Sequence, residues 1–218
     1  CSSDLGGAPV SYGLDCFDYS WARPDPKLMA QAGIKVVCRY LWDSENDKGI
    51  DRAEQSALHA ATLGITYNYE ARSGNHLMGA AQGKIDGARA RAYAARLDVP
   101  KGTPIYYSCD QQVSDVQLPT VLAYLHAADH PDHQARCYAQ KSVCDAFGRP
   151  AWQTLAWSGG QISKNAVLYQ YEINQTFHGS AVDYNTILDI SRLGAWWPEV
   201  KEWLDVADKQ EVQDAFTA

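Results

Sequence analysis

The sequence has no apolar run of eighteen or more residues, so it predicts no membrane-spanning helix. It also has no block of Lys and Arg: 19 basic residues against 26 acidic ones leave a formal net charge of -7. Because nucleic-acid affinity depends on clustered cations, we expect neither a nucleic-acid partner nor a membrane partner.

Cysteine is too scarce to frame a small disulfide-rich fold: there are six in 218 residues, at positions Cys1, Cys16, Cys38, Cys109, Cys137 and Cys144. Four of them fall in predicted strands, which favours buried thiols. No pair has CxxC spacing and no histidine lies beside them, so a zinc site is poorly supported. His126, His130 and His133 have helical spacing and could bind a metal, but a solvated helix end before Pro131 is the better interpretation. We expect no metal and no cofactor.

Two nucleophile signatures are weak or missing as well. Ser108 has no GxSxG context, which argues against a serine-hydrolase elbow, and the neighbouring Cys109 is a weak candidate nucleophile. What the chain does contain is 46% hydrophobic residues and an aromatic supply of 13 Tyr and 7 Trp against 4 Phe. Tyr and Trp combine an apolar face with a hydrogen-bonding tip, which suits sugars, although most of them can equally fill a core.

The length favours a single domain covering residues 1–218, with a core at about 11–195 and a C-terminal helix or linker start at about 196–218. The chain starts at Cys1 without a Met, so we expect a processed or trimmed product whose export signal is not visible. A monomer is expected.

Apolar runs and helical patterns alternate along the chain. The pattern predicts strands at 11–17, 34–40, 65–70, 104–109, 135–138, 152–157, 167–171 and 181–184, and helices at 26–32, 51–63 (closed by Gly64), 80–97, 116–129 and 141–147. The last two connections, 158–166 and 172–180, are too short for a parallel crossover through a helix. The prediction is therefore an α/β fold, an irregular (β/α) TIM-like barrel with about five regular βα units followed by three strands on short loops.

Seven predicted strands end on, or just after, a residue that can do sugar chemistry: Asp15, Arg39, Glu70, Asp110, Trp157, Gln170 and Asp183. Each alone could be an ordinary solvated boundary. In a parallel barrel, however, strand ends and the following loops form one rim, so their recurrence predicts a shared pocket.

Glycosidic cleavage needs two carboxyl groups of unlike character, one protonated and one ionised. We predict four catalytic carboxyls, Asp15, Glu70, Asp110 and Asp183. Glu70 follows two tyrosines in an apolar strand, where desolvation would suit it to the acid role, and Asp110 is the natural ionised partner. Arg39 could instead pair with one of these acids in a charge-balancing role.

Aromatic and amide side chains supply candidate sugar contacts. Trp152, Gln153 and Trp157 could form an aromatic wall beside the flexible Ser158 to Gly160 segment, with even odds of wall or core for Trp157. Gln170 and Asn185 carry amides that match sugar hydroxyls, though either could be satisfied inside the barrel.

Together these residues resemble a known family, the glycoside-hydrolase-like domain of actinobacterial secreted proteins and actinophage endolysins. The resemblance spans about Tyr12 to Asn185 and rests on Gly13, Asp15, Arg39, Tyr40, Tyr69, Glu70, Tyr106, Asp110, Trp152, Gln153, Trp157, Gln170, Asp183 and Asn185. More distantly, the family resembles the Chalaropsis-type muramidases, whose barrel has five strand-helix units and three irregularly linked strands. The resemblance implies a peptidoglycan-directed glycosidase that cuts the β-1,4 linkage next to muramic acid and acts at the bacterial cell wall, whether phage-released or secreted.

One departure from the muramidase pattern matters. Those enzymes usually carry an Asp-x-Glu pair at the end of the fourth strand, and here the run is Asp110, Gln111 and Gln112. Either Glu70 takes the acid role from the neighbouring strand, or this branch of the family is a non-catalytic module that binds cell-wall glycan. A barrel used only as a structural piece of a virion or envelope is the third alternative.

Overall fold

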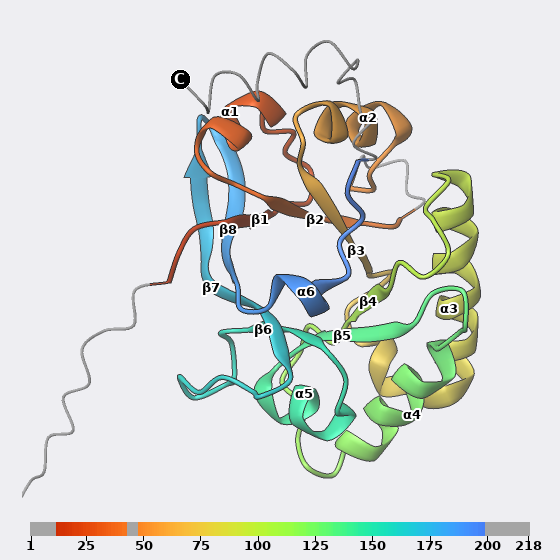
Figure 1. Ribbon diagram of the computed structural model, residues 1–218. Coiled ribbons are helices and arrows are strands. Elements are labelled where there is room, and N and C mark those ends of the chain that lie inside the picture. The colour runs from red at the N-terminus through yellow and green to blue at the C-terminus, as the bar shows by residue number, and fades with distance from the viewer. Residues whose placement is uncertain (1–11, 43–47, 199–218) are drawn as a thin grey trace, which may run out of the picture.

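The computed structural model describes residues 12–42 and 48–198, and these form a closed barrel of eight strands in the order β1 to β8. The strands are β1 Cys16–Asp18, β2 Val36–Tyr40, β3 Gly64–Tyr69, β4 Ile105–Ser108, β5 Ala135–Ala139, β6 Ala151–Thr154, β7 Ala166–Phe177 and β8 Ser180–Ile187. The helices are α1 Pro26–Gln31, α2 Arg52–Ala60, the short 3-10 helix η1 Asn75–Met78, α3 Gly79–Arg96, α4 Leu118–Ala128, α5 Lys141–Phe147 and α6 Ile190–Leu193. The predicted irregular TIM-like barrel is confirmed (Figure 1).

The barrel is regular in its first part and abbreviated in its second. Strands β1 to β7 pair in parallel, each with the next, whereas β8 runs antiparallel to both β7 and β1. Residues 155–165 join β6 to β7 without a helix, and residues 178–179 form the turn of the β7–β8 hairpin. The hairpin corrects one expectation: residues 172–177 were predicted as a loop, but they continue β7 because β8 pairs with them.

Helix starts follow the expected capping chemistry. Asp25 accepts a hydrogen bond from the Lys27 backbone N at the start of α1, and Asp51 does the same for Glu54 at the start of α2. The end of α2 differs from the prediction, because Gly64 is the first residue of β3 rather than the helix terminator. Thr62 takes the left-handed backbone there, with φ of 63°.

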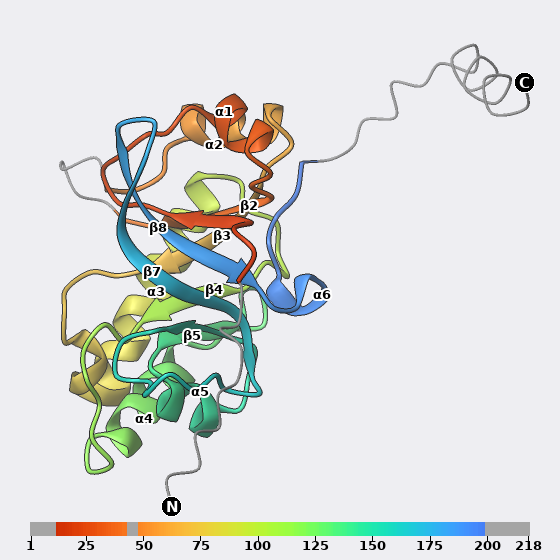
Figure 2. The same ribbon diagram turned by 90° about the vertical axis from the view of Figure 1, so that its left-hand side faces the viewer.

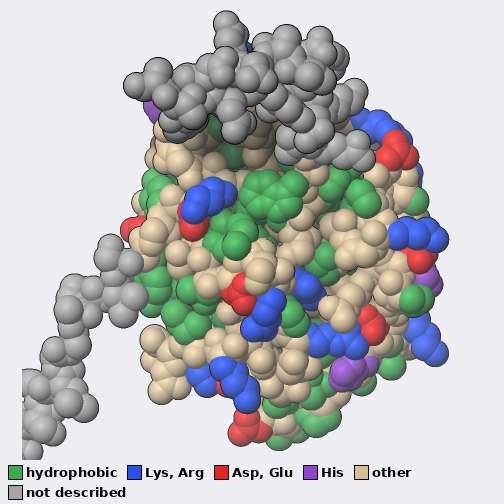
Figure 3. Space-filling model, in the orientation of Figure 1, with side chains coloured by type: hydrophobic (Ala, Val, Ile, Leu, Met, Phe, Trp, Pro, Cys, Tyr) green, Lys and Arg blue, Asp and Glu red, His purple; other side chains and the backbone are tan. Residues whose placement is uncertain are grey.

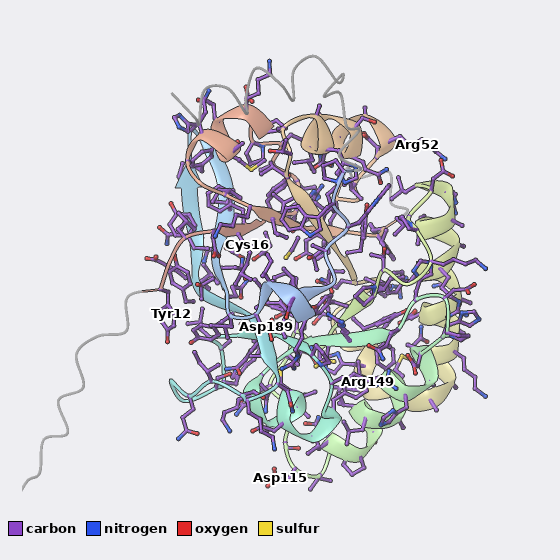
Figure 4. All side chains as sticks on the ribbon, viewed as in Figure 1. Tyr12, Cys16, Arg52, Asp115, Arg149 and Asp189 are labelled. Atoms are coloured by element: carbon purple, nitrogen blue, oxygen red, sulfur yellow. The ribbon has the colours of Figure 1, made fainter. Side chains whose placement is uncertain are left out.

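Alternate side chains of each strand point into the barrel, as a pleated sheet requires. Cys16, Cys38, Tyr106, Trp152 and Leu168 belong to one buried cluster inside the barrel, while the intervening side chains pack under the surrounding helices. Figure 4 labels Cys16 in the middle of the barrel. Five cysteines are buried free thiols, as predicted, and Cys1 lies outside the described residues.

Helix α6 closes one end of the barrel, which we call the base. The Tyr106 hydroxyl donates to the Leu193 carbonyl at 2.9 Å, and Arg136 Nη1 donates to the same oxygen at 2.6 Å. In Figure 2, α6 lies on the right of the barrel and the far end of the β7–β8 hairpin lies at the upper left. The opposite end, where the parallel strands terminate, is called the rim. Trp196 pairs with Ile65 of β3, and the segment from 199 onward lies outside the described residues.

None of the helices within residues 12–42 and 48–198 combines the length and the hydropathy that crossing a bilayer requires. The two longest helices, α3 and α4, pack closely through small residues. Gly83 and Gly87 of α3 face the α4 backbone so closely that a Cβ on Gly83 would stand 2.1 Å from the Tyr124 carbonyl oxygen.

We therefore predict that Gly83→Ala destabilises the protein by about 2–3 kcal/mol, because the new methyl group meets backbone that cannot move aside. An ordinary helix would gain up to about 1 kcal/mol from the same change. Urea unfolding monitored by circular dichroism measures the difference. Gly13→Ala is the control, since nothing lies within 4 Å of its Cβ position. A Gly83→Ala protein as stable as the parent would contradict the close approach of the two helices.

Candidate active site

The rim is built from inward-pointing positions at the carboxyl ends of the strands. The pleat that sends Cys16 inward also sends Asp18 inward, and the same alternation runs through every strand. The polar side chains brought together in this way are Asp18, Tyr40, Asn68, Glu70, Ser108, Asp110, Tyr138, Thr154, Gln170, Asp183 and Asn185. Apolar layers fill the barrel below them, so the polar groups are confined to the mouth.

Two of the rim carboxyls form a linked pair at the seam where β1 meets β8. Asp18 and Asp183 are register partners, and Gln170 Nε2 donates to Asp18 Oδ2 at 3.0 Å and to Asp183 Oδ2 at 3.2 Å. Asn185 Nδ2 also donates to Asp18 Oδ2, at 2.7 Å. Burial and the neighbouring Asp183 charge raise the pKa of Asp18 to about 7 against the pull of these amides. Desolvation also raises the pKa of Asp183, although the Asn174 backbone N–H opposes it.

Glu70 lies across the mouth in a different environment. Lys48 Nζ is 3.0 Å from Glu70 Oε1, and the Ser108 hydroxyl donates to Oε2 at 3.1 Å. Asn68 Nδ2 in turn donates to the Ser108 oxygen at 2.8 Å. Both carboxyl oxygens of Glu70 therefore accept charge-assisted hydrogen bonds.

Asp110 is exposed at the mouth, and no ion pair to its carboxyl is found among the described residues. The rim atoms around this carboxyl partly exclude water, and this desolvation raises its pKa; the charges of Glu70 and Asp183 raise it further, while Lys48 opposes them. Asp110 and Glu70 therefore differ in the partners that surround them.

A hollow of about 240 Å³ opens beside this cluster. Its floor includes Asp18 and Asp183, one side carries Trp21, and the β7–β8 hairpin forms the other. The mouth therefore offers both carboxyl groups and a space next to them.

The structure brings most, but not all, of the predicted site residues to the rim. Those at or just below it are Glu70, Asp110, Asp183, Tyr40, Gln170 and Asn185, and Trp157 stands 46% exposed on the loop after β6. Those located elsewhere are Asp15, Arg39, Tyr69, Tyr106, Trp152 and Gln153.

Asp15 lies at the base, so the expectation that it joins the other acids is not met. It precedes β1, accepts a hydrogen bond from the Ile187 backbone N at 2.8 Å, and lies 4.0 Å from Lys35. Figure 3 views this base face, where apolar side chains are exposed between charged ones. The predicted strand, 11–17, began five residues before β1, so Asp15 lies ahead of the strand and not at its carboxyl end. Asp15 and Asp18 are three positions apart, which places them at opposite ends of the barrel and on opposite faces of the sheet.

Three other candidates point out of the barrel into the helical layer. Arg39 is fully buried and donates to both oxygens of Glu54, with distances of 2.6 and 3.1 Å, and to the Tyr19 carbonyl. Arg39 therefore balances a charge, but its partner is Glu54 of α2 and not one of the four predicted catalytic acids. Tyr69 packs against Tyr107, and Gln153 holds the loop after β6 through the Gln161 carbonyl and the Ser163 N–H.

Two more candidates point inward but lie below the rim. Tyr106 contacts the base plug, and Trp152 packs against Tyr138 while its Nε1 donates to Asn185 Oδ1 at 2.7 Å. Trp152 is fully buried and supports the floor of the site rather than forming its wall.

Sequence reasoning missed Asp18, Lys48, Ser108 and Tyr138. Counting in twos from buried Cys16 or Tyr106 would have found Asp18 and Ser108, because both continue the inward face of their strands. Tyr138, whose hydroxyl donates to Gln170 Oε1 at 2.8 Å, follows the same rule. Lys48 had no such signal, since it lies on the connection after β2. Within the described residues, no three His, Cys, Asp or Glu side chains are grouped as metal ligands.

A barrel whose carboxyl rim gathers unlike carboxyl groups next to a hollow belongs to the glycoside-hydrolase-like class of barrel proteins. The model of the Rv2525c-like, glycoside hydrolase-like domain matches residues 27–192, and the chain belongs to this family.

Solved structures of similar proteins agree. The chain is similar to the Tat-secreted protein Rv2525c of Mycobacterium tuberculosis, crystallised with L-tartrate, at 26% identity over 85% of this chain and 100% of that one, with a TM-score of 0.75. Its fold also resembles a muramidase from Acremonium alcalophilum (16% identity, 83% and 97% coverage, TM-score 0.50). A third is the modular autolysin LytC from Streptococcus pneumoniae with a synthetic peptidoglycan ligand (13% identity, 79% and 46% coverage, TM-score 0.52). None of the curated proteins compared with the chain by sequence matches it.

The raised pKa of Asp18 predicts how stability depends on pH. The folded protein holds this proton up to about pH 7, whereas an unfolded aspartate releases it near 3.8. The contribution of Asp18 to the free energy of unfolding is therefore fully present below pH 3.8 and is lost as the pH rises to about 7. Over this range the free energy of unfolding falls by up to about 1.4 kcal/mol per pH unit. Asp18→Asn should reduce this slope, because an amide does not titrate. The variant should still fold, because the Asn oxygen can accept the hydrogen bonds of Gln170 and Asn185. Urea unfolding at several pH values checks it, and identical slopes in the two proteins would contradict the buried pair.

Proposed function

We propose that the protein is a peptidoglycan-directed glycoside hydrolase of the muramidase type. The observation that carries this is the contrast between Asp110 and Glu70 at one mouth: within the described residues the partly desolvated Asp110 carboxyl has no ion-pair partner, whereas Glu70 contacts Lys48 and Ser108. Glycosidic cleavage uses two carboxyl groups of unlike character, and this contrast favours Asp110 as the acid and Glu70 as its partner, the reverse of the roles predicted from the sequence.

In this proposal Asp110 is the general acid. It gives its proton to the glycosidic oxygen as the bond to the anomeric carbon breaks, and Glu70 stabilises the positive charge that develops on the sugar. A solvent water then adds to the anomeric carbon and gives a proton back to Asp110, which restores the acid. Asp18 and Asp183 hold substrate hydroxyls in the hollow beside them, and Gln170 keeps those two carboxyls in register. Tyr40 and the exposed Trp157 contact substrate from the rim, and the buried Asn185 positions Asp18 from below.

The cell-wall substrate is supported by the relatives. The two fold relatives that act on or bind peptidoglycan components are a muramidase and an autolysin, and Rv2525c is secreted. We further propose that the barrel works at the bacterial cell wall, as the catalytic module of an actinophage endolysin or of a secreted actinobacterial protein, and that it is monomeric.

A second candidate function has one specific observation in its favour. The position two residues after Asp110 is the exposed amide Gln112, and Gln111 is engaged with the Ser73 hydroxyl at 2.8 Å. Neither amide can donate a proton as an acid would. A glycan-binding module without catalysis would keep the hollow and lack turnover, so it predicts retention on cell walls without released reducing ends.

The direct test is the release of reducing ends from purified peptidoglycan, together with loss of turbidity. Asp110→Asn and Glu70→Gln should each lower the rate by about 10²–10⁴-fold, since each removes one half of the acid and carboxylate pair. Asp15→Asn is the matched control, because it changes a partly buried aspartate at the base and should retain full activity. Lysis by Glu70→Gln or Asp110→Asn at the parent rate would eliminate these assignments, and an inert parent that still binds walls would establish the binding module.

A further inference from the structure

Trp21 is an exposed aromatic residue that the chemistry above does not use. It lies on the connection between β1 and α1, three residues after Asp18, and is 65% exposed. Isolated exposed apolar side chains are common on protein surfaces and need no explanation. Trp21 differs because it faces the hollow whose floor is formed by Asp18 and Asp183.

Hydrogen bonds and an ion pair of Arg23 hold the connection that carries Trp21. Arg23 Nη1 donates to the carbonyls of Ser20 and Ala22 at 3.0 and 2.8 Å, and its Nη2 donates to the Gly49 carbonyl at 3.0 Å. Arg23 Nε also pairs with Glu54 at 2.9 Å. The backbone around the indole is therefore held in place before any ligand arrives, which lowers the entropic cost of binding.

The hollow has an apolar side and a polar floor. Trp21 and Ala22 stand on one side, and Ala181 and Val182 of the hairpin stand on the other. At the floor, the carboxyl oxygens of Asp18 and Asp183 accept hydrogen bonds. A pyranose ring matches this arrangement, because its C–H face is apolar and its hydroxyls donate from the edge.

Lys48 connects this hollow to the proposed site of cleavage. Its ammonium lies 6.0 Å from the Trp21 ring centroid and 4.2 Å from that of Tyr40, and it also pairs with Glu70. Lys48, the ion-pair partner of Glu70, thus lies between Trp21 and the carboxyl group assigned to cleavage.

We propose that Trp21 is the stacking platform of a subsite that takes one sugar ring, with its apolar face on the indole and its hydroxyls on Asp18 and Asp183. The volume of about 240 Å³ lies below the range of about 300–1,000 Å³ that is usual for larger ligands, which fits a single ring. This inference rests on the proposed glycan substrate and extends it to a specificity residue.

Binding of peptide-free glycan strands from purified peptidoglycan, measured by isothermal titration calorimetry, tests the subsite. The titrations use the Asp110→Asn background so that the ligand is not consumed. Trp21→Ala should weaken binding by about tenfold, whereas Trp21→Tyr should restore most of it, because a smaller ring still offers a flat face. Trp197→Ala is the control: Trp197 is 40% exposed and lines a hollow at the base. In the parent background, Trp21→Ala should raise KM and leave kcat nearly unchanged. Thermal melting confirms that each variant is folded.

The outcomes separate this inference from the proposed function. Tenfold weakening by Trp21→Ala together with full binding by Trp197→Ala supports the platform, even if the parent proves to bind without cleaving. Equal binding by Trp21→Ala and its background protein overturns it. If no glycan binding is measurable while the parent still releases reducing ends, the subsite is wrong and the hydrolase stands.

Discussion

The site depends on the closure of the barrel through the β1–β8 pair. Because side chains alternate along each strand, closure decides which residues share the interior, and the register of the last pair decides which of them meet. Here Cys16 pairs with Asn185 and Asp18 pairs with Asp183. Two acids separated by most of the chain thereby become neighbours at the mouth, and the apolar side chains below them remove the water that would screen their repulsion.

The repulsion between carboxyl groups is offset in different ways on the two sides of the mouth. The Asp18 and Asp183 pair is bridged by amides, which cannot neutralise charge, so burial raises the pKa of both groups. Glu70 instead has a cation partner, Lys48, at 3.0 Å. The charges of Glu70 and Asp183 both raise the pKa of Asp110, and Lys48 opposes them. A rim on which every carboxyl group had a cation partner would bind sugars through hydrogen bonds, but none of its carboxyl groups would have the raised pKa that suits a proton donor.

Much of the fold could be predicted from the chain because its signals are local. Helix α5 was predicted at residues 141–147 and begins and ends there, since Gly148 takes a left-handed backbone with φ of 71° directly after it. The short final connections correctly indicated an abbreviated second half. The site was less predictable because it depends on which alternate residues of each strand point into the barrel, and this in turn depends on the exact bounds of the strand. The first strand was predicted to begin at residue 11 rather than Cys16, so Asp15 was chosen in place of Asp18, and reading polar residues near strand ends without regard to the face they occupy brought in Arg39 and Gln153, which point outward.

The least predictable feature is also the one that shapes the hollow. Residues 172–177 contain polar side chains typical of a loop, and only pairing with β8 makes them a strand. The pairing is interrupted by register shifts around Asn174, which has φ of 58°, and the interruption turns the Asn174 N–H toward the Asp183 carboxylate at 2.7 Å. Irregularities of this kind are frequent beside active sites. They free a backbone N–H, which would otherwise pair with the neighbouring strand, to donate to a side chain. In a regular barrel a helix would follow β7 and cover the outside of the sheet. Here β7 continues into the β7–β8 hairpin instead. The hairpin supplies residues that line the hollow and the backbone N–H of Asn174 that donates to Asp183.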